Sequence, residues 1–221
     1  MKKPVTIILL LLSFTFFSQD CKIQIENPIK DIKQTSDGDF VFISDDYKIT
    51  KVNSDFDTIW HNDNLDSGNN YLSSIHPTFD GGYMCSGSSS SGNLFKMNSV
   101  GDTVWVNNCQ IFFGPMSSLN IIEIIQTSDS GYAFMAIYGH MSFYSMLVKT
   151  DKFGDTLWTK MNILNAPNST DSRAKTINET SNGDLVISGL VNTYFPTYSK
   201  YSYLYKLNSN GDSLWAKTYD D

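Results

Sequence analysis

The chain repeats one pair of short sequence blocks four times, and this repetition constrains the fold more than any other feature. The first block contains Thr-Ser-Asp-Gly-Asp/Gly followed by a bulky residue, or a close variant, and it occupies 34–40, 77–83, 126–132 and 179–185. The second block contains Gly-Asp-Thr-Leu-Trp or a close variant, and it occupies 53–60, 98–105, 151–158 and 208–215. Because the two blocks recur in the same order, each pair marks one structural unit.

Each unit is expected to contain four short strands. Asp-Gly or Asn-Gly between apolar runs is typical of a hairpin turn, because glycine tolerates a positive φ and Asp or Asn caps its own backbone. In the third unit, for example, apolar runs at 121–125 and 132–137 flank the first turn, and runs at 146–149 and 156–159 flank the second. The pattern predicts an antiparallel meander of four strands.

Four-stranded units of this length fit the blades of a β-propeller, in which each sheet needs neighbours to cover its faces. We expect an all-β fold, a β-propeller or an open propeller arc of four four-stranded antiparallel blades. The expected blades are about 28–62, 70–108, 119–162 and 173–219. The alternative is a β-sandwich, in which the tryptophan strands would share two facing sheets. One tryptophan ends each second block and is expected to pack between blades, on the outermost strand: Trp60, Trp105, Trp158 and Trp215.

The two blocks also carry a resemblance. The Thr-Ser-Asp-Gly-Gly-Tyr-like block, followed by Lys-x-Asn/Asp-x-x-Gly-Asp-Thr-Leu-Trp, resembles repeats of large secreted β-propeller proteins of Bacteroidetes-type bacteria. It is also similar to the tryptophan-docking repeats of quinoprotein-like propellers. The resemblance covers about residues 28–219 and implies a propeller blade without implying an activity. The chain has no recognisable motif for a quinone ligand, so no cofactor is expected.

Charge and composition exclude several function classes. The net charge is −7 and the only arginine is Arg173, so nucleic acid is not an expected partner. Charged residues make up 18% and aromatic residues 14%, a composition too apolar and too aromatic for a disordered chain.

The N-terminus has the pattern of a secretory signal. Lys2 and Lys3 precede an apolar run at 5–17 that is short for a membrane span. We expect residues 1–18 to be a cleaved signal peptide and residues 19–221 to form the propeller domain, secreted or on the cell surface, with no transmembrane segment after cleavage. Four blades are expected either as a four-bladed propeller or, as we favour, as a fragment of a larger one. Lipid anchoring at Cys21 is a weaker alternative, because the residues before it fit a lipoprotein signal poorly. Cys85 and Cys109 are expected to be buried thiols, although a disulfide between them stays open.

Local signatures of catalysis and metal binding are missing. The three histidines lack metal-ligand spacing, and the chain has no phosphate-binding loop or nucleophile elbow. We therefore expect no catalytic residue, no metal and no cofactor, and a binding or scaffold module without catalytic activity. The alternative is a propeller-based enzyme, carbohydrate-active or quinone-dependent, with a site at the blade axis. Carboxylates that converge on that axis would favour the enzyme.

The length of the connections predicts which face binds. The two repeated turns of a blade lie at one end of its sheet and hardly vary. The connections at the other end differ between units, at 45–46, 88–92, 138–144 and 190–202. Variable loops on a rigid scaffold are where binding is usually found, so an unknown protein or glycan partner is expected there. The predicted ligand-binding residues are Tyr138, His140, Phe143, Tyr194, Phe195, Tyr198 and Tyr201.

Overall fold

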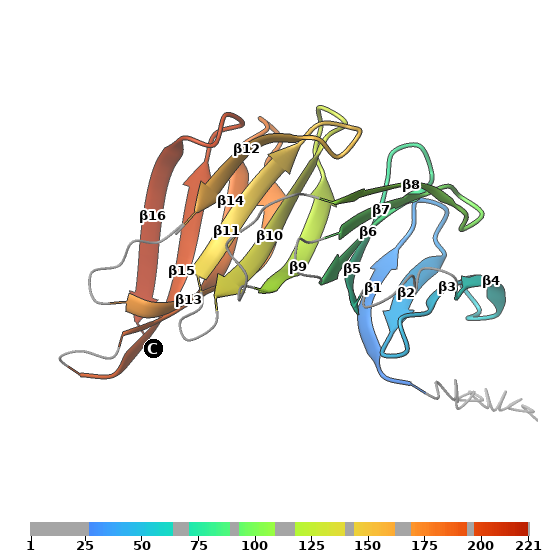
Figure 1. The fold of residues 1–221 in the computed structure, drawn as a ribbon, viewed down its shortest axis with the longest axis horizontal. Coiled ribbons are helices and arrows are strands. Elements are labelled where there is room, and N and C mark those ends of the chain that lie inside the picture. Colours follow the sequence, from blue (N-terminus) through green and yellow to red (C-terminus); the bar gives the residue numbers. More distant parts are fainter. Residues whose placement is uncertain are drawn as a thin grey trace, which may run out of the picture.

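The fold is an arc of four small β-sheets (Figure 1). The computed structural model describes residues 27–63, 71–88, 93–108, 118–139, 144–161, 169–193 and 197–220. Sixteen strands and no helix occur in these residues. This part of the chain therefore contains no helix of the length and hydrophobicity that a membrane crossing requires.

The strands follow one another along the chain in four groups. The first sheet has β1 (Ile29–Gln34), β2 (Phe40–Ser44), β3 (Ile49–Val52) and β4 (Thr58–Asn62). The second has β5 (Tyr71–Pro77), β6 (Tyr83–Ser88), β7 (Asn93–Met97) and β8 (Thr103–Asn108). The third has β9 (Ser118–Gln126), β10 (Tyr132–Gly139), β11 (Tyr144–Thr150) and β12 (Thr156–Met161). The fourth has β13 (Ser169–Glu179), β14 (Leu185–Thr193), β15 (Ser199–Leu207) and β16 (Ser213–Asp220).

Each sheet is an antiparallel meander in which neighbours in sequence are neighbours in space. The four tryptophans lie in β4, β8, β12 and β16, the last strands of four separate sheets. The predicted all-β propeller architecture is thus confirmed, and the β-sandwich alternative is wrong. We call the four sheets blades 1 to 4.

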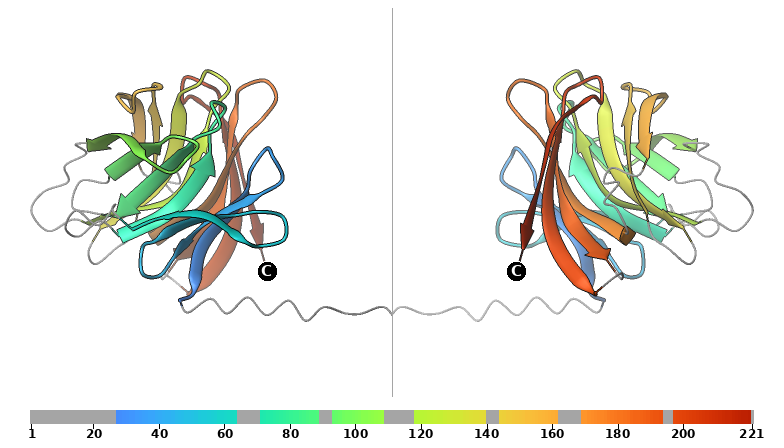
Figure 2. Two further views of the ribbon diagram at one scale, coloured as in Figure 1. Left: turned by 90° about the vertical axis from the view of Figure 1, so that its right-hand side faces the viewer. Right: turned by 90° about the vertical axis from the view of Figure 1, so that its left-hand side faces the viewer.

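Adjacent blades meet mainly through their first strands. β1 contacts β5, β5 contacts β9, and β9 contacts β13, so these four strands line the inner side of the arc. Among the described residues, no strand of blade 1 contacts a strand of blade 4. The arc is therefore open, and the end-on views of Figure 2 show blades 1 and 4 at its two ends.

The repeated turns fold alike because their sequences supply the same backbone conformations. In the first turn of each blade, the residue after Asp or Asn has a positive φ: Gly38, Gly81, Ser130 and Gly183. The amide of the threonine that opens the turn donates to the carbonyl of the residue four positions later, as in Thr35 to Asp39 at 2.9 Å. In the second turn, the opening Asn or Asp accepts two backbone amides with its side chain, as Asn98 does from Val100 and Asp102.

The core consists of three apolar clusters, one between each pair of adjacent blades. Trp60, Trp105 and Trp158 each pack against the following blade. The Trp60 ring meets the Tyr83 ring edge-on at 5.5 Å between centroids, and Trp105 meets Tyr132 in the same way at 6.4 Å. Such burial of large aromatic rings is a main source of interface stability.

Several loop boundaries differ from the prediction. β10 extends to Gly139, and β14 and β15 pair as far as Thr193 and Ser199, so much of the expected loop at 190–202 is strand. The connection after β2 has four residues instead of the two-residue tip expected at Asp45–Asp46. The turn signals marked the constant turns, but polar and aromatic residues near the other end continue the β-ladder, because backbone pairing tolerates them. Cys85 is a buried free thiol, whereas Cys21 and Cys109 lie outside the described residues.

Candidate functional site

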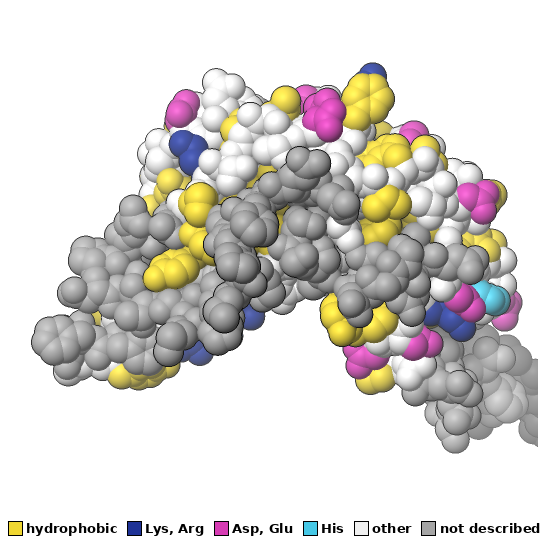
Figure 3. Space-filling view, in the orientation of Figure 1, with side chains coloured by type: hydrophobic (Ala, Val, Ile, Leu, Met, Phe, Trp, Pro, Cys, Tyr) yellow, Lys and Arg dark blue, Asp and Glu magenta, His cyan; other side chains and the backbone are white. Residues whose placement is uncertain are grey.

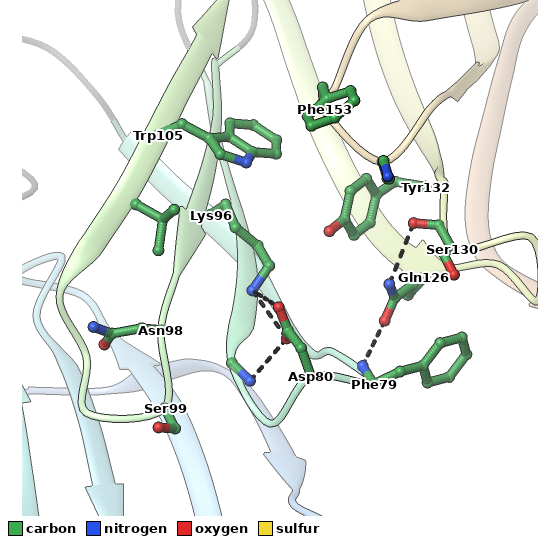
Figure 4. Close-up of a pocket in the computed structure, with 13 residues that line it drawn as sticks. Phe79, Asp80, Lys96, Asn98, Ser99, Trp105, Gln126, Ser130, Tyr132 and Phe153 are labelled. Carbon is green, nitrogen blue, oxygen red and sulfur yellow. Dashed lines mark hydrogen bonds and ion pairs between the residues drawn. The ribbon is translucent and has the colours of Figure 1, made fainter.

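A pocket of about 540 Å³ opens between blades 2 and 3, at the end where the constant turns lie (Figure 4). Four turns surround it: those after β5 and β7 in blade 2, and those after β9 and β11 in blade 3. This volume is within the range of small-ligand sites. The face on which it lies is opposite to the one predicted from loop length.

Aromatic rings form much of the pocket wall. Trp105 and Tyr132 lie at its base, where they hold the two blades together. Phe79 and Phe153 stand on turns at the rim and are 70% and 60% exposed. The ammonium group of Lys152 lies 4.9 Å from the centre of the Phe153 ring. Two exposed phenyl rings at a pocket rim are available to a ligand with an apolar face.

Polar groups between the rings tie the turns together. The side-chain oxygen of Gln126 accepts the Phe79 amide at 2.7 Å, and its nitrogen donates to the Ser130 carbonyl at 3.3 Å (Figure 4). The pocket is also lined by Asn98 and Ser99. Gln126 thus fixes the turn that carries Phe79 relative to blade 3.

An ion pair lies at the blade 2 side of the pocket. The Lys96 ammonium lies 3.0 Å from an Asp80 carboxylate oxygen, and Asp80 also accepts the Gly82 amide. Burial opposes the charge of Asp80, but hydrogen bonds from Thr78 and Lys96 outweigh it and lower the Asp80 pKa to about 2. Burial and the nearby Asp80 charge raise the Tyr132 pKa to about 12, so its hydroxyl stays protonated at neutral pH. The wall therefore has an ionic end and a neutral hydroxyl.

The repeat allows the same position to be compared in the other two grooves between blades. Where Phe79 stands in blade 2, blades 1 and 3 have Ser36 and Ser128. Where Phe153 stands in blade 3, blades 2 and 4 have Val100 and Asn210. The groove between blades 2 and 3 is therefore the one that combines two phenyl rings at its rim.

Only part of the predicted binding set lies within the described residues. Tyr198 is exposed, while Tyr138 and Tyr201 lie in strands β10 and β15 and are half-buried. The Tyr138 ring packs on Tyr144 at 5.6 Å and on the core between blades 2 and 3. His140, Phe143, Tyr194 and Phe195 lie outside the described residues. The predicted loop site stays a prediction.

Sequence reasoning did not identify the pocket. Its turns were recognised as hairpins, and their constancy argued against a site there. The signal that could have found it is the departure from the repeat at two positions, Phe79 and Phe153, because a bulky apolar residue in an exposed turn has no role in the turn itself.

A second group of polar residues meets on the inner side of the arc. Asp31 of β1 accepts the Ser74 hydroxyl at 3.0 Å and the Ile75 amide at 2.9 Å. Glu123 of β9 accepts the Ile177 amide at 2.7 Å. Each carboxylate thus links its own blade to the next one.

Lys33 connects these two carboxylates. Its ammonium lies 3.1 Å from Asp31 and 3.8 Å from Glu123. Burial, together with the Lys33 charge, lowers the His76 pKa to about 4, and the buried Nδ1 of His76 has no hydrogen-bond partner among the described residues. Burial also raises the pKa of Glu123. Among the described residues, no group of three His, Cys, Asp or Glu side chains is arranged to hold a metal ion.

Charged and apolar side chains are interspersed over the described part of the face drawn in Figure 3. Neither sign of charge gathers into a broad patch there. The described part of this face therefore has no broad electrostatic surface for a charged partner.

Comparisons with known proteins report on the fold. No protein family model matches the chain, and no curated protein matches it. Among solved structures, it is similar to a Bacteroides caccae protein of unknown function, with 10% identity, 87% of this chain and 82% of that chain covered, and a TM-score of 0.50. It is also similar to the Dos1 propeller, with 12% identity, 88% and 48% covered, and a TM-score of 0.59.

A Synechocystis apocarotenoid oxygenase mutant matches at 12% identity, with 86% and 48% covered and a TM-score of 0.50. The chain spans about half the length of this protein and of the Dos1 propeller. Identities this low show a shared fold alone. The described residues therefore have a β-propeller architecture, and function must be argued from the site.

Proposed function

We propose that the chain is an exported binding module, without catalytic activity, which holds a glycan in the pocket between blades 2 and 3. The observation that carries this proposal is the pair of exposed phenyl rings, Phe79 and Phe153, on a scaffold whose other grooves have smaller residues there. Sugar rings have apolar faces that pack on aromatic side chains and hydroxyls that pair with amides and hydroxyls. Ser99 and Ser130, which carry hydroxyls, and Lys152, which carries an ammonium group, line the same pocket.

The test is a titration of the purified protein with a panel of soluble oligosaccharides, measured by calorimetry. The Phe79→Ser, Phe153→Asn double variant returns the rim to residues found in the neighbouring grooves, so the fold should be preserved. Loss of two stacking rings should weaken binding at least about tenfold. The matched control is Val100→Asn in the groove between blades 1 and 2, which should bind normally.

Binding that is indifferent to the double variant would contradict the pocket assignment. Binding that is instead lost in Tyr198→Ser would place the partner on the variable-loop face. A partner that proves to be a protein rather than an oligosaccharide would contradict the glycan assignment while leaving a binding module.

Export rests on the N-terminal pattern of residues 1–18, which lie outside the described residues. Expression with these residues should give a secreted product whose N-terminal sequencing begins at Gln19. Retention of Met1 in the mature product would contradict it.

An enzyme with its site at the inner side of the arc is the second candidate. In its favour, Asp31 and Glu123 converge there around Lys33, beside His76 with its lowered pKa. We place it second because both carboxylates already accept backbone amides of the next blade, which is a structural task. If the unmodified protein hydrolyses any oligosaccharide in the panel and the folded Glu123→Gln variant does not, the enzyme becomes the preferred candidate.

A further inference from the structure

The outer face of blade 4 repeats the surface that each earlier blade uses to bind its successor. In blade 3 that surface consists of Ala133, Met135, Leu147 and Trp158, and the first three are fully buried against blade 4. The strand registers place Lys149 opposite both Ala133 and Trp158 in blade 3. In blade 4 they place Lys206 opposite both Val186 and Trp215. The counterparts of the four residues can therefore be assigned without ambiguity.

On blade 4 the corresponding residues are Val186, Ser188, Leu204 and Trp215. The first three are partly exposed, and Trp215 is 38% exposed. β16 pairs with β15 alone, and among the described residues blade 4 contacts only strands of blade 3. The right-hand view of Figure 2 shows blade 4 with no other sheet in front of it. The face is thus of the docking type but lacks the blade that would cover it.

The three existing interfaces define what such a covering blade must offer. Each tryptophan lies on a left-handed glycine in the second turn of the next blade: Gly101, Gly154 or Gly211. A Cβ atom at Gly101 would lie 2.8 Å from the Trp60 ring, and one at Gly154 would lie 2.9 Å from the Trp105 ring. Glycine is therefore required both by the turn conformation and by the indole ring that lies on it.

A large residue at the start of the second strand completes the socket. Tyr83 and Tyr132 meet the preceding tryptophan with their rings, and Leu185 belongs to the cluster that contains Trp158. The turn also offers a backbone acceptor, since the Trp158 indole donates to the Ser209 carbonyl at 3.2 Å.

Blade 1 does not meet this requirement. Its second turn has Phe56 at the glycine position, with φ of 67°, and the Phe56 ring stacks on Phe40 at 5.5 Å. This ring occupies the side of blade 1 from which a preceding tryptophan would approach. Blade 1 is therefore capped, and neither ring closure within one chain nor head-to-tail docking of a second copy can use the contact seen between the other blades.

We propose that the outer face of blade 4 is a docking surface for a further blade of the same repeat, one that has glycine at the left-handed position of its second turn. The proposal follows from continuity. Three interfaces of one design are already formed, and blade 4 presents the tryptophan side of a fourth interface at Trp215. It concerns a different surface from the glycan pocket and is independent of it.

The test converts blade 1 into the proposed partner. In the full chain, Phe56→Gly with Phe40→Tyr restores the glycine and tyrosine that blades 2 and 3 have at these positions. This variant should associate head to tail, with a mass by light scattering that rises with concentration. The unmodified chain should remain monomeric, and Trp215→Ala in the variant background should abolish association. Association of the unmodified chain, or association of the variant that is insensitive to Trp215, would overturn the proposal.

A linked probe gives a second measurement. Residues 162–221 are repeated once after Asp221, with the appended tryptophan changed to phenylalanine. The Trp215 contribution to acrylamide quenching, taken as the difference from the same fusion with Trp215→Phe, should fall by about half, because an indole covered by the next blade is shielded from solvent. The matched control has Gly211→Phe in the appended copy and should leave quenching unchanged. Equal quenching in the two fusions would overturn the proposal.

Discussion

The two middle blades and the two outer blades hold the same lysine in different ways. The lysine of the third strand contacts an aspartate of the first turn in every blade: Lys51, Lys96, Lys149 and Lys206. In blades 2 and 3 the first turn ends on glycine, at Gly82 and Gly131. In blades 1 and 4 it ends on Asp39 and Asp184.

The glycine leaves room for the lysine side chain to reach a backbone carbonyl. In the middle blades, Lys96 and Lys149 also donate to the carbonyl of the next residue, at 2.9 and 3.0 Å, and their side chains are 8% and 4% exposed. A Cβ atom at Gly131 would lie 2.3 Å from that carbonyl oxygen and 2.7 Å from the lysine nitrogen.

In the outer blades an aspartate stands at the glycine position and pairs with the lysine. Lys51 contacts both Asp37 and Asp39, and Lys206 contacts Asp184, with exposed fractions of 11% and 22%. Blades covered on both faces thus bury their lysine beside a glycine, whereas end blades leave it somewhat more exposed and pair it with the aspartate at the glycine position. The repeat is one template with two versions, adapted to position in the arc.

The tryptophans give the largest expected contrast between a middle and an outer blade. Trp158→Ala removes an indole ring from the interface between blades 3 and 4 and should lower the free energy of unfolding by about 3 kcal/mol. Trp215→Ala removes a side chain that no blade covers, and should cost less than about 1 kcal/mol. Urea denaturation of both variants measures the difference. Equal losses would mean that the face of blade 4 is covered in the isolated protein.

Exchanging the two turn versions should have the next largest effect. Gly131→Asp places atoms where the Thr150 carbonyl and Lys149 already lie, so it should lower the free energy of unfolding by about 2–3 kcal/mol. The reverse change, Asp39→Gly, leaves Lys51 paired with Asp37 and should cost about 1 kcal/mol or less. If the two exchanges cost the same, position in the arc does not select the turn version.

Replacing the lysines should give a smaller difference in the free energy of unfolding between a middle and an outer blade. Lys149→Met removes the donor to Asp129 and to the Thr150 carbonyl from a buried position, and should cost about 1 kcal/mol. Lys206 is the more exposed of the two lysines, and Asp184 keeps its hydrogen bond from Asn182 when the lysine is removed, so Lys206→Met should cost less than Lys149→Met. Thermal denaturation at neutral pH compares them, and a larger loss at Lys206 would reverse the interpretation of the outer blades.

The same repeat template explains which parts of the structure the sequence alone predicts. The positions that recur, such as the turn glycines and Trp60, predict the blades because each has one physical task in every copy. The positions that depart from the template were harder to interpret. Phe56 and Phe79 look alike in sequence, yet Phe56 caps the first blade and Phe79 lines a pocket.

Contacts between distant strands are the part that sequence patterns do not encode. Glu123 meets Lys33 because the first strands of blades 1 and 3 converge on the inner side of the arc, not because of any spacing along the chain. The loop boundaries also escaped prediction, because strands of the fourth blade continue their pairing through tyrosine and serine residues such as Tyr201 and Ser202.

Low pH should destabilise the two turn versions to different extents, and this is the smallest of the expected effects. Hydrogen bonds from Lys51 and Thr35 lower the Asp37 pKa to about 2, and the Asp80 pKa is also about 2. A carboxylate whose pKa is lower in the folded state stabilises the protein above its unfolded pKa of about 4, and that contribution is lost as the pH falls through the folded value. The free energy of unfolding should therefore decline between about pH 4 and pH 2.

Asparagine variants then distinguish the blades. Asp80→Asn removes the only turn carboxylate that contacts Lys96, so the decline below pH 4 should become shallower. Asp37→Asn leaves Asp39 at 3.1 Å from Lys51 and should flatten the decline less. Because both aspartates are more than half exposed, the difference should shrink as salt is added. A steeper decline in Asp80→Asn than in the unmodified protein would contradict the role given to a single carboxylate in the middle blades.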